Sequence, residues 1–182
     1  MKIKATGKRH EIRKSLPLLP LLPLLLQSCQ STTTPQGLEV KVARVVSGQT
    51  LEVIDKGEQS ARATRVRLVG VDAPDLQQQP WGLRAKERLE AMIGDEAVML
   101  ELDVQDKDSF GRRLAYVWKD RVLLNEKLVA EGYVLSSVRS PNHKYDQRLS
   151  RAQEWARLMG QGIWNPEKPM RLTPTEFRRQ YR

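Results

Sequence analysis

The stretch that most constrains this chain runs from Arg65 to Asp75, where an apolar strand ends in two carboxylates around a proline. Pro74 fixes its own φ, and Ala73 before it is pushed towards extended geometry. The backbone therefore leaves the strand stiffly, so Asp72 and Asp75 can be held near one another. Two close carboxylates beside an arginine suit a hard cation together with a phosphate. Taken alone, however, the stretch is better explained as a strand end with a solvated acidic turn.

The N-terminal segment does not belong to the folded part of the chain. Its start is basic, and a short apolar run follows at Leu18–Leu26, interrupted by Pro20 and Pro23. That run is too short to span a bilayer as a stable helix. A basic region followed by a short apolar region is typical of an export signal. We therefore predict a lipoprotein-type signal peptide over residues 1–28.

The single cysteine of the chain lies directly after this segment, in the sequence Leu26-Gln27-Ser28-Cys29. The sequence resembles a bacterial lipobox, although Gln27 is unusual in that motif. We expect lipidation of Cys29, a flexible tether over residues 29–37, and an exported protein anchored to a bacterial membrane at its periplasmic or extracellular face. An ordinary cleaved signal or an uncleaved anchor is the alternative. One cysteine allows no intramolecular disulfide.

The net charge of +9 overstates how basic the folded part is. Residues 1–28 hold six Lys or Arg and one acid, so 25 basic and 21 acidic residues remain, a net charge of +4. That charge is compatible with a polyanionic partner but does not establish one. Residues 167–182 form a basic C-terminal tail, which we expect to be solvated unless it contacts a polyanion. Its arginines are Arg171, Arg178, Arg179 and Arg182.

Alternating apolar patterns predict five short strands, at residues 38–46, 50–54, 65–71, 97–104 and 114–118. Patterns with helical spacing predict three helices, at residues 81–93, 122–131 and 145–159. Short strands joined by tight turns indicate a small barrel, and five strands fit an OB-fold. Periodicity alone permits other α+β arrangements.

Five short motifs occur in a specific order, at residues 46–50, 66–75, 108–116, 124–129 and 162–164. In this order they resemble the staphylococcal-nuclease-like (thermonuclease) family. The resemblance implies an α+β fold over residues 38–166, a five-stranded OB-fold β-barrel with three helices. It also implies calcium-dependent hydrolysis of DNA or RNA, with single-stranded nucleic acid as the expected substrate and a monomer as the expected state.

The resemblance assigns roles to four residues that bind or react with the substrate. Arg67 and Arg112 match the family's two phosphate-binding arginines, whose guanidinium groups can hold phosphate oxygens as charge builds up. Asp75 matches the general base, usually a glutamate, and is one methylene shorter. A general base contributes ~10²–10⁴-fold, so a shorter side chain could forfeit much of that factor. Phe110 is an apolar neighbour for a base.

The implied calcium ligands are Asp72, the carbonyl oxygen of Ala73, and Gln49. Gln49 stands where the family usually has an aspartate, and Ser47 replaces another common acid. A glutamine offers a neutral oxygen but no charge, and affinity for hard cations follows ligand charge. We therefore expect a weakened calcium site, roughly in the millimolar range.

Three functions remain open from the sequence. The first is an exported, lipid-anchored, calcium-dependent nuclease. The second is a catalytically impaired barrel that binds a polyanion or a protein partner at the membrane face. It is favoured by Gln49, by Asp75, and by Ser137 and Arg139, which stand where the family has tyrosines that pack on nucleotides. The third is a structural envelope lipoprotein without nucleic-acid contact.

Overall fold

The computed structural model describes residues 36–55, 63–138 and 141–181, all within one structural unit of the chain. The predicted signal peptide, Cys29, most of the tether and Arg139 lie outside these residues. Among the residues described, no helix combines the length and the apolar character needed to cross a bilayer.

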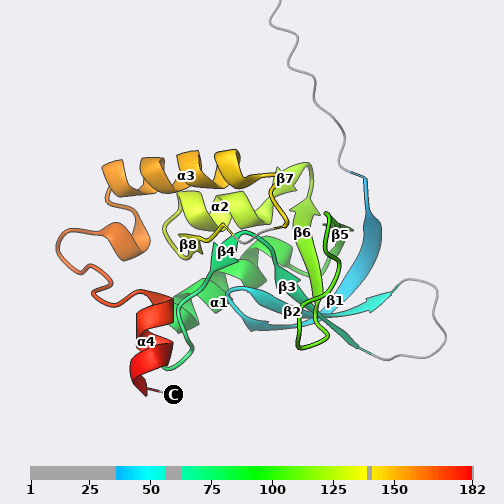
Figure 1. Ribbon diagram of the computed structural model, residues 1–182, viewed down its shortest axis with the longest axis horizontal. Coiled ribbons are helices and arrows are strands. Elements are labelled where there is room, and N and C mark those ends of the chain that lie inside the picture. The colour runs from blue at the N-terminus through cyan, green and yellow to red at the C-terminus, as the bar shows by residue number, and fades with distance from the viewer. Residues whose placement is uncertain (1–35, 56–62, 139–140, 182) are drawn as a thin grey trace, which may run out of the picture. The chain divides into compact units, whose positions relative to one another are not determined.

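Five strands form a closed barrel (Figure 1). The strands are β1 (Leu38–Ser47), β2 (Thr50–Asp55), β3 (Thr64–Leu68), β5 (Ala97–Glu101) and β6 (Arg113–Lys119). Neighbours pair in the antiparallel order β3-β2-β1-β5-β6, and a parallel pairing between β3 and β6 closes the barrel. The predicted five-stranded barrel is therefore confirmed.

Alternating side chains from these strands fill the barrel interior. In β2 the buried pair is Leu51 and Val53, and in β5 it is Val98 and Leu100, each at most 1% exposed. Successive side chains of a strand point to opposite faces, so the neighbouring side chains lie on the outside of the barrel, where other segments partly or fully cover them. Burying each such side chain contributes about 1.5–3 kcal/mol. The same alternation places polar residues, including Arg67, on the barrel wall.

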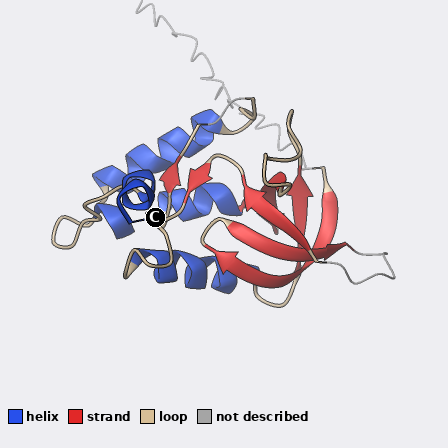
Figure 2. Cartoon of the chain, turned by 60° about the horizontal axis from the view of Figure 1, so that its bottom comes forward, coloured by secondary structure: helices blue, strands red, loops and turns tan. Residues whose placement is uncertain are grey.

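The helices gather on one side of the barrel (Figure 2). They are α1 (Trp81–Ile93), α2 (Leu124–Ala130), α3 (Asp146–Leu158) and α4 (Pro174–Tyr181), with a 3-10 turn at Gly162–Trp164. The first three match the predicted helices, although α2 starts later because Val122–Leu123 form strand β7 against β6. Helix α4 was not predicted, since its segment was expected to be a solvated tail.

The predicted third strand, residues 65–71, is interrupted. Strand β3 ends at Leu68, and β4 (Val71–Asp72) pairs instead with β8 (Leu135–Ser136). The chain turns at Gly70, whose φ of +75° does not continue a strand, and the fully buried Asn125 ties this turn to β6. Its Oδ1 accepts a hydrogen bond from the Val117 N–H at 2.9 Å, and its Nδ2 donates to the Val69 carbonyl at 2.7 Å. The chain then turns away from the barrel and carries Asp72 to its surface.

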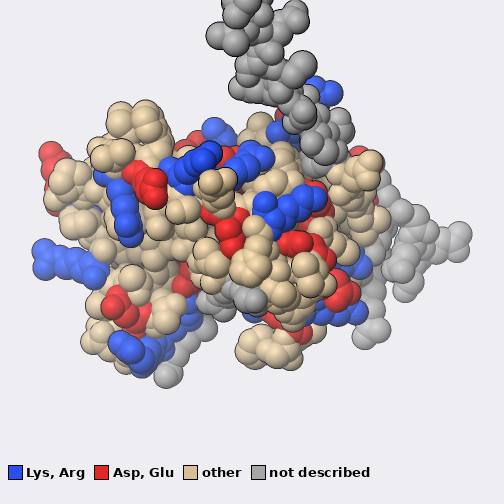
Figure 3. All heavy atoms as spheres, turned by 45° about the horizontal axis from the view of Figure 1, so that its top comes forward, with Lys and Arg blue, Asp and Glu red and all other residues tan. Residues whose placement is uncertain are grey.

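A further difference concerns the end of β5. Strand β5 ends at Glu101 rather than at Val104, which is largely exposed. Glu101 is buried there because its carboxylate accepts hydrogen bonds from Trp118 Nε1 at 2.7 Å and from the Tyr145 hydroxyl at 2.9 Å. The face turned forward in Figure 3 intersperses Lys and Arg with Asp and Glu, in keeping with the modest net charge of the folded part.

Candidate functional site

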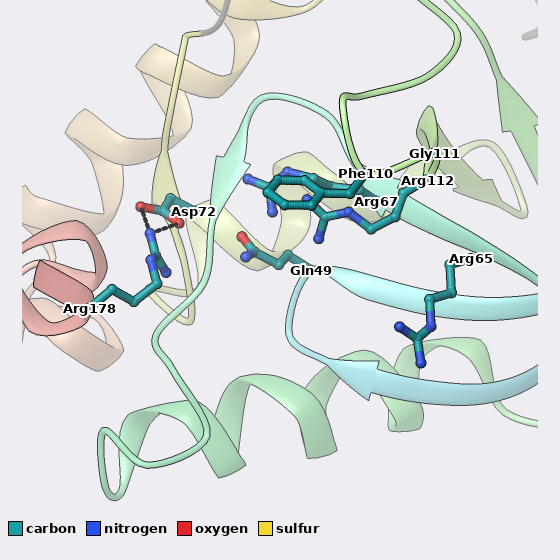
Figure 4. Close-up of a pocket in the computed structure, with 8 residues that line it drawn as sticks. All are labelled: Gln49, Arg65, Arg67, Asp72, Phe110, Gly111, Arg112 and Arg178. Carbon is teal, nitrogen blue, oxygen red and sulfur yellow. Dashed lines mark hydrogen bonds and ion pairs between the residues drawn. The ribbon is translucent and has the colours of Figure 1, made fainter. Parts of the chain in front are cut away.

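A cavity of about 630 Å³ opens on the barrel wall. Four separated segments line it: the turn between β1 and β2, strands β3 and β4, the loop before β6, and helix α4. Its charged side chains are four arginines and one aspartate, so the cleft is positive overall. The lining residues are Gln49, Arg65, Arg67, Asp72, Phe110, Gly111, Arg112 and Arg178 (Figure 4).

Arg67 lies in β3, next to its last residue, and is paired with Thr50 of β2 on one side and with Leu114 of β6 on the other. The residue is only 8% exposed. Its Nη2 donates a hydrogen bond to the Val71 carbonyl at 3.2 Å, which holds the guanidinium beside the segment that carries Asp72. A fixed guanidinium on a strand is well placed to bind an anion without first losing side-chain freedom.

Asp108 shapes the loop that carries Arg112. Its Oδ1 accepts the backbone N–H groups of Phe110 and Arg112, each at 3.0 Å. Its Oδ2 accepts Nε and Nη2 of the Arg112 guanidinium at 2.8 and 2.7 Å. Burial would raise the pKa of this carboxyl, but these hydrogen bonds outweigh it and hold the pKa below its ordinary value. Gly111 supplies the φ of +74° that closes the loop.

Phe110 projects from the same loop and is 82% exposed. The Arg112 guanidinium lies 5.4 Å from the centre of its ring, within the range of a cation–π contact. An exposed aromatic ring beside a positive cleft can stack on a nucleobase while the cleft holds a phosphate. The loop from Asp108 to Arg112 therefore presents a charged and an aromatic group together.

Asp75 is buried in an adjoining cavity of about 400 Å³, which shares Gln49, Arg112 and Arg178 with the cleft. Its Oδ1 accepts the backbone N–H of Gln77 at 3.0 Å. The loop is seated on the start of α1 at Gly82, where a Cβ would lie 1.8 Å from the Asp75 carbonyl oxygen. Only a glycine permits this approach, so Gly82 helps to fix the position of Asp75.

The three predicted calcium ligands lie close together, but protein groups already engage all of them. Gln49 Oε1 accepts the Ala73 N–H at 2.8 Å. Both carboxylate oxygens of Asp72 accept Nη2 of Arg178 at 2.8 Å, and Thr175 Oγ1 donates to Oδ2 at 3.0 Å. Nη1 of Arg178 also lies 3.4 Å from the Ala73 carbonyl oxygen.

This donor set does not fit calcium, which takes six to eight oxygen ligands, several of them charged. Asp72 is the one carboxylate among the described residues that line the cleft, and it is paired with Arg178. Nor does any group of three or more His, Cys, Asp or Glu come together in the described part of the chain. Calcium binding therefore stays a prediction.

The structure thus brings Gln49, Arg67, Asp72, Phe110 and Arg112 into one cleft and leaves Ala73 and Asp75 in the cavity beside it. Their chemical roles remain predictions.

Sequence reasoning missed Arg178, although a signal was present. Thr173-Pro174-Thr175-Glu176 has the form of a helix start, with a threonine cap, a proline at the first helical position and a glutamate at the third.

Comparison with known proteins gives the chain a family. A family model described as "Staphylococcal nuclease homologue" matches residues 65–166. The thermonuclease of Staphylococcus hyicus is 37% identical over 130 residues, covering 69% of this chain and 75% of that protein. The thermonuclease of Staphylococcus intermedius is 36% identical over 140 residues, covering 74% and 81%. Endonuclease YncB of Bacillus subtilis is 30% identical over 135 residues, covering 70% and 62%. The chain belongs to the staphylococcal nuclease family.

Proposed function

We propose that the chain is a nuclease that hydrolyses phosphodiester bonds of nucleic acid. Its relatives include proteins named thermonuclease and endonuclease, which supports a nuclease activity. The observation that carries the proposal is the convergence of Arg67 and Arg112, with Phe110 beside them, in one positive cleft. A phosphate flanked by a base fits such a cleft better than a protein or lipid partner does.

In the proposed reaction, Arg67 and Arg112 bind the phosphate and stabilise the negative charge that builds up on its oxygens. Asp75 accepts a proton from the attacking water, whose oxygen bonds to phosphorus while the bond to the leaving oxygen breaks. Arg112 stabilises the charge on the leaving oxygen. Phe110 stacks on a neighbouring base, a contact worth about 1–3 kcal/mol, and this favours single-stranded over paired nucleic acid.

Calcium dependence is the part of the sequence prediction that this geometry does not accommodate. A bound calcium would supply positive charge beside the phosphate. Asp72, Ala73 and Gln49 would be its ligands, but Arg178 and the Ala73 N–H already occupy their oxygens. We therefore assign calcium no step. The sequence still predicts that Gln49→Asp strengthens calcium binding in calorimetry and that Asp75→Glu raises the rate of cleavage.

A second candidate is a module that binds nucleic acid but cuts it poorly. The observation that favours it is the state of the carboxylates, since Asp72 is paired with Arg178 and Asp75 accepts a backbone N–H. For either function we propose an exported protein anchored through lipid on Cys29. That proposal rests on the sequence of the first 29 residues alone.

The test is cleavage of single-stranded DNA and RNA by the full chain purified in detergent, with calcium or with chelator. We expect Arg67→Ala and Arg112→Ala to lower the rate by roughly 10²–10³-fold. The matched control is Arg44→Ala, because Arg44 lies on β1 outside the cleft, with an exposed side chain paired with Glu52. Binding that weakens with salt but is not followed by cleavage would favour the second candidate.

A further inference from the structure

Arg178 lies where the sequence predicts a metal ion. It reaches Asp72 from α4, across 106 residues of sequence (Figure 4). It also contacts the Ala73 carbonyl, so it touches two of the three predicted ligands. The Asp72 side chain is only 7% exposed. A buried carboxylate is costly unless a cation or hydrogen-bond donors satisfy it. In this chain a guanidinium provides that partner.

Helix α4 is held in place by contacts other than the ion pair. Thr173 and Glu176 form a reciprocal cap, in which Glu176 Oε2 accepts the Thr173 N–H at 2.8 Å and Thr173 Oγ1 accepts the Glu176 N–H at 3.2 Å. Pro174 is buried at the first helical position. Gln78 Nε2 donates to the Leu172 carbonyl at 2.7 Å and ties the segment before α4 to the loop that follows Asp75. Arg178 is therefore presented to the cleft by an anchored helix.

The charges favour arginine over calcium at this position. With glutamine at position 49, Asp72 is the one carboxylate among the three predicted ligands, and it balances one positive charge rather than two. Calcium sites with few charged ligands bind at roughly 10⁻⁴–10⁻³ M. A guanidinium on the same chain competes at a high effective concentration, in the millimolar range or above. Arg178 therefore outcompetes calcium for Asp72 under ordinary ionic conditions.

The guanidinium keeps donors for a second anion. An arginine has five N–H donors. Nη2 serves Asp72 and Thr175, and Nη1 makes one long contact with the Ala73 carbonyl. Among the described residues, no acceptor is bonded to its Nε–H. The side chain is 27% exposed and lines the cleft together with Arg67 and Arg112.

We propose that Arg178 takes the place of the divalent cation, so that Arg67, Arg112 and Arg178 bind a nucleic-acid phosphate without metal. Asp72 then serves as the anchor of Arg178 rather than as a metal ligand. The substrate class rests on the proposed function, but the inference concerns binding and stands even if cleavage is absent.

The test measures binding of a fluorescent single-stranded oligonucleotide to the full chain by anisotropy, in chelator and in about 10 mM calcium, roughly ten times the weakest dissociation constant given above. The wild type binds in chelator, and calcium changes its affinity less than twofold. Arg178→Ala weakens binding in chelator by roughly ten- to a hundredfold, the value of one hydrogen bond to a charged group. It also lowers the slope of log K against log salt by about 0.7, the value for one phosphate contact on a single strand.

Arg179→Ala is the matched control, because Arg179 is the exposed neighbour of Arg178 on the same helix. We expect it to change affinity less than threefold. Arg178→Lys retains the positive charge, so we expect it to retain part of the affinity. This variant tests the role of Arg178 even if Arg178→Ala does not fold. Titration of calcium into the protein in a calorimeter adds a readout without nucleic acid. We expect no heat of binding with the wild type and a heat that indicates weak calcium binding with Arg178→Ala.

Two results would overturn the proposal: unchanged or tighter oligonucleotide binding by Arg178→Ala in chelator, or at least tenfold tighter binding by the wild type when calcium is added. The first result would mean that α4 either does not contribute to binding or blocks the cleft. The second would mean that calcium takes part in binding. Failure of the proposed nuclease function gives a different result. The wild type and the variants then bind the oligonucleotide as expected above, but none of them cleaves it with calcium or with chelator.

Discussion

Replacing Asn125 tests how the barrel positions the cleft. Asn125 is fully buried and satisfies two backbone groups, the Val117 N–H at 2.9 Å and the Val69 carbonyl at 2.7 Å. Asn125→Leu keeps the branching and the number of heavy atoms of the side chain but leaves both groups without a partner. A buried backbone group left unsatisfied costs about 1–3 kcal/mol, and the gain from an apolar side chain offsets part of that. We expect the free energy of unfolding to fall by about 2–4 kcal/mol.

The assay is urea unfolding followed by circular dichroism, where a domain of this size has about 5–15 kcal/mol to lose. The comparison variant is Asn142→Leu. Asn142 is also buried and also makes two bonds, to the N–H and the carbonyl of Gln105, but Gln105 is exposed and its groups can turn to water. If the free energy of unfolding falls by less than 1 kcal/mol in Asn125→Leu, or falls equally in both variants, the two backbone hydrogen bonds of Asn125 do not stabilise the barrel as stated.

Three further predictions concern the site. Phe110→Ala weakens oligonucleotide binding by about 1–3 kcal/mol in anisotropy and leaves urea unfolding unchanged, since the ring is exposed. Gly82→Ala forces a shift of the Asp75 loop, because the new Cβ would lie 1.8 Å from a backbone oxygen. We expect the rate of cleavage to fall more than about tenfold and the free energy of unfolding to fall by about 1–3 kcal/mol. The lowered pKa of Asp108 stabilises the folded state above the ordinary value of 3.8, and this stability is lost as the pH falls through the lowered value. The advantage of the wild type over Asp108→Asn in urea unfolding therefore shrinks between pH 7 and pH 3.

The barrel could be predicted from the sequence because its evidence is local. Alternation at Leu51 and Val53, or at Val98 and Leu100, appears within a few consecutive residues, so each strand can be recognised without knowledge of its partner. The break between β3 and β4 could not be predicted in this way. A glycine can occur within a strand, so the run does not show that Gly70 takes a φ of +75°, nor that Asn125, 56 residues from Val69, holds the Val69 carbonyl.

The candidate site was predictable in part for the same reason. The stretch that contains Arg67 and Asp72 and the loop that contains Phe110 and Arg112 are short motifs, so their residues could be named before their positions were known. Arg178 could not be assigned, because its pairing with Asp72 spans 106 residues and follows from where α4 docks. The helix start at Thr173 predicts a helix but not its partner.

We propose that Arg67 and Arg112 bind one phosphate in a shared cleft, and a double-mutant cycle measures whether the two side chains act together. The affinity for a single-stranded oligonucleotide is measured for the wild type, Arg67→Ala, Arg112→Ala and the double variant. Two residues that hold the same group show a coupling energy of about 0.5–3 kcal/mol, whereas independent sites add within about 0.3–0.5 kcal/mol. We predict a coupling above 0.5 kcal/mol, with the double variant losing less affinity than the two single losses together. Strict additivity, or no loss in either single variant, would contradict the account.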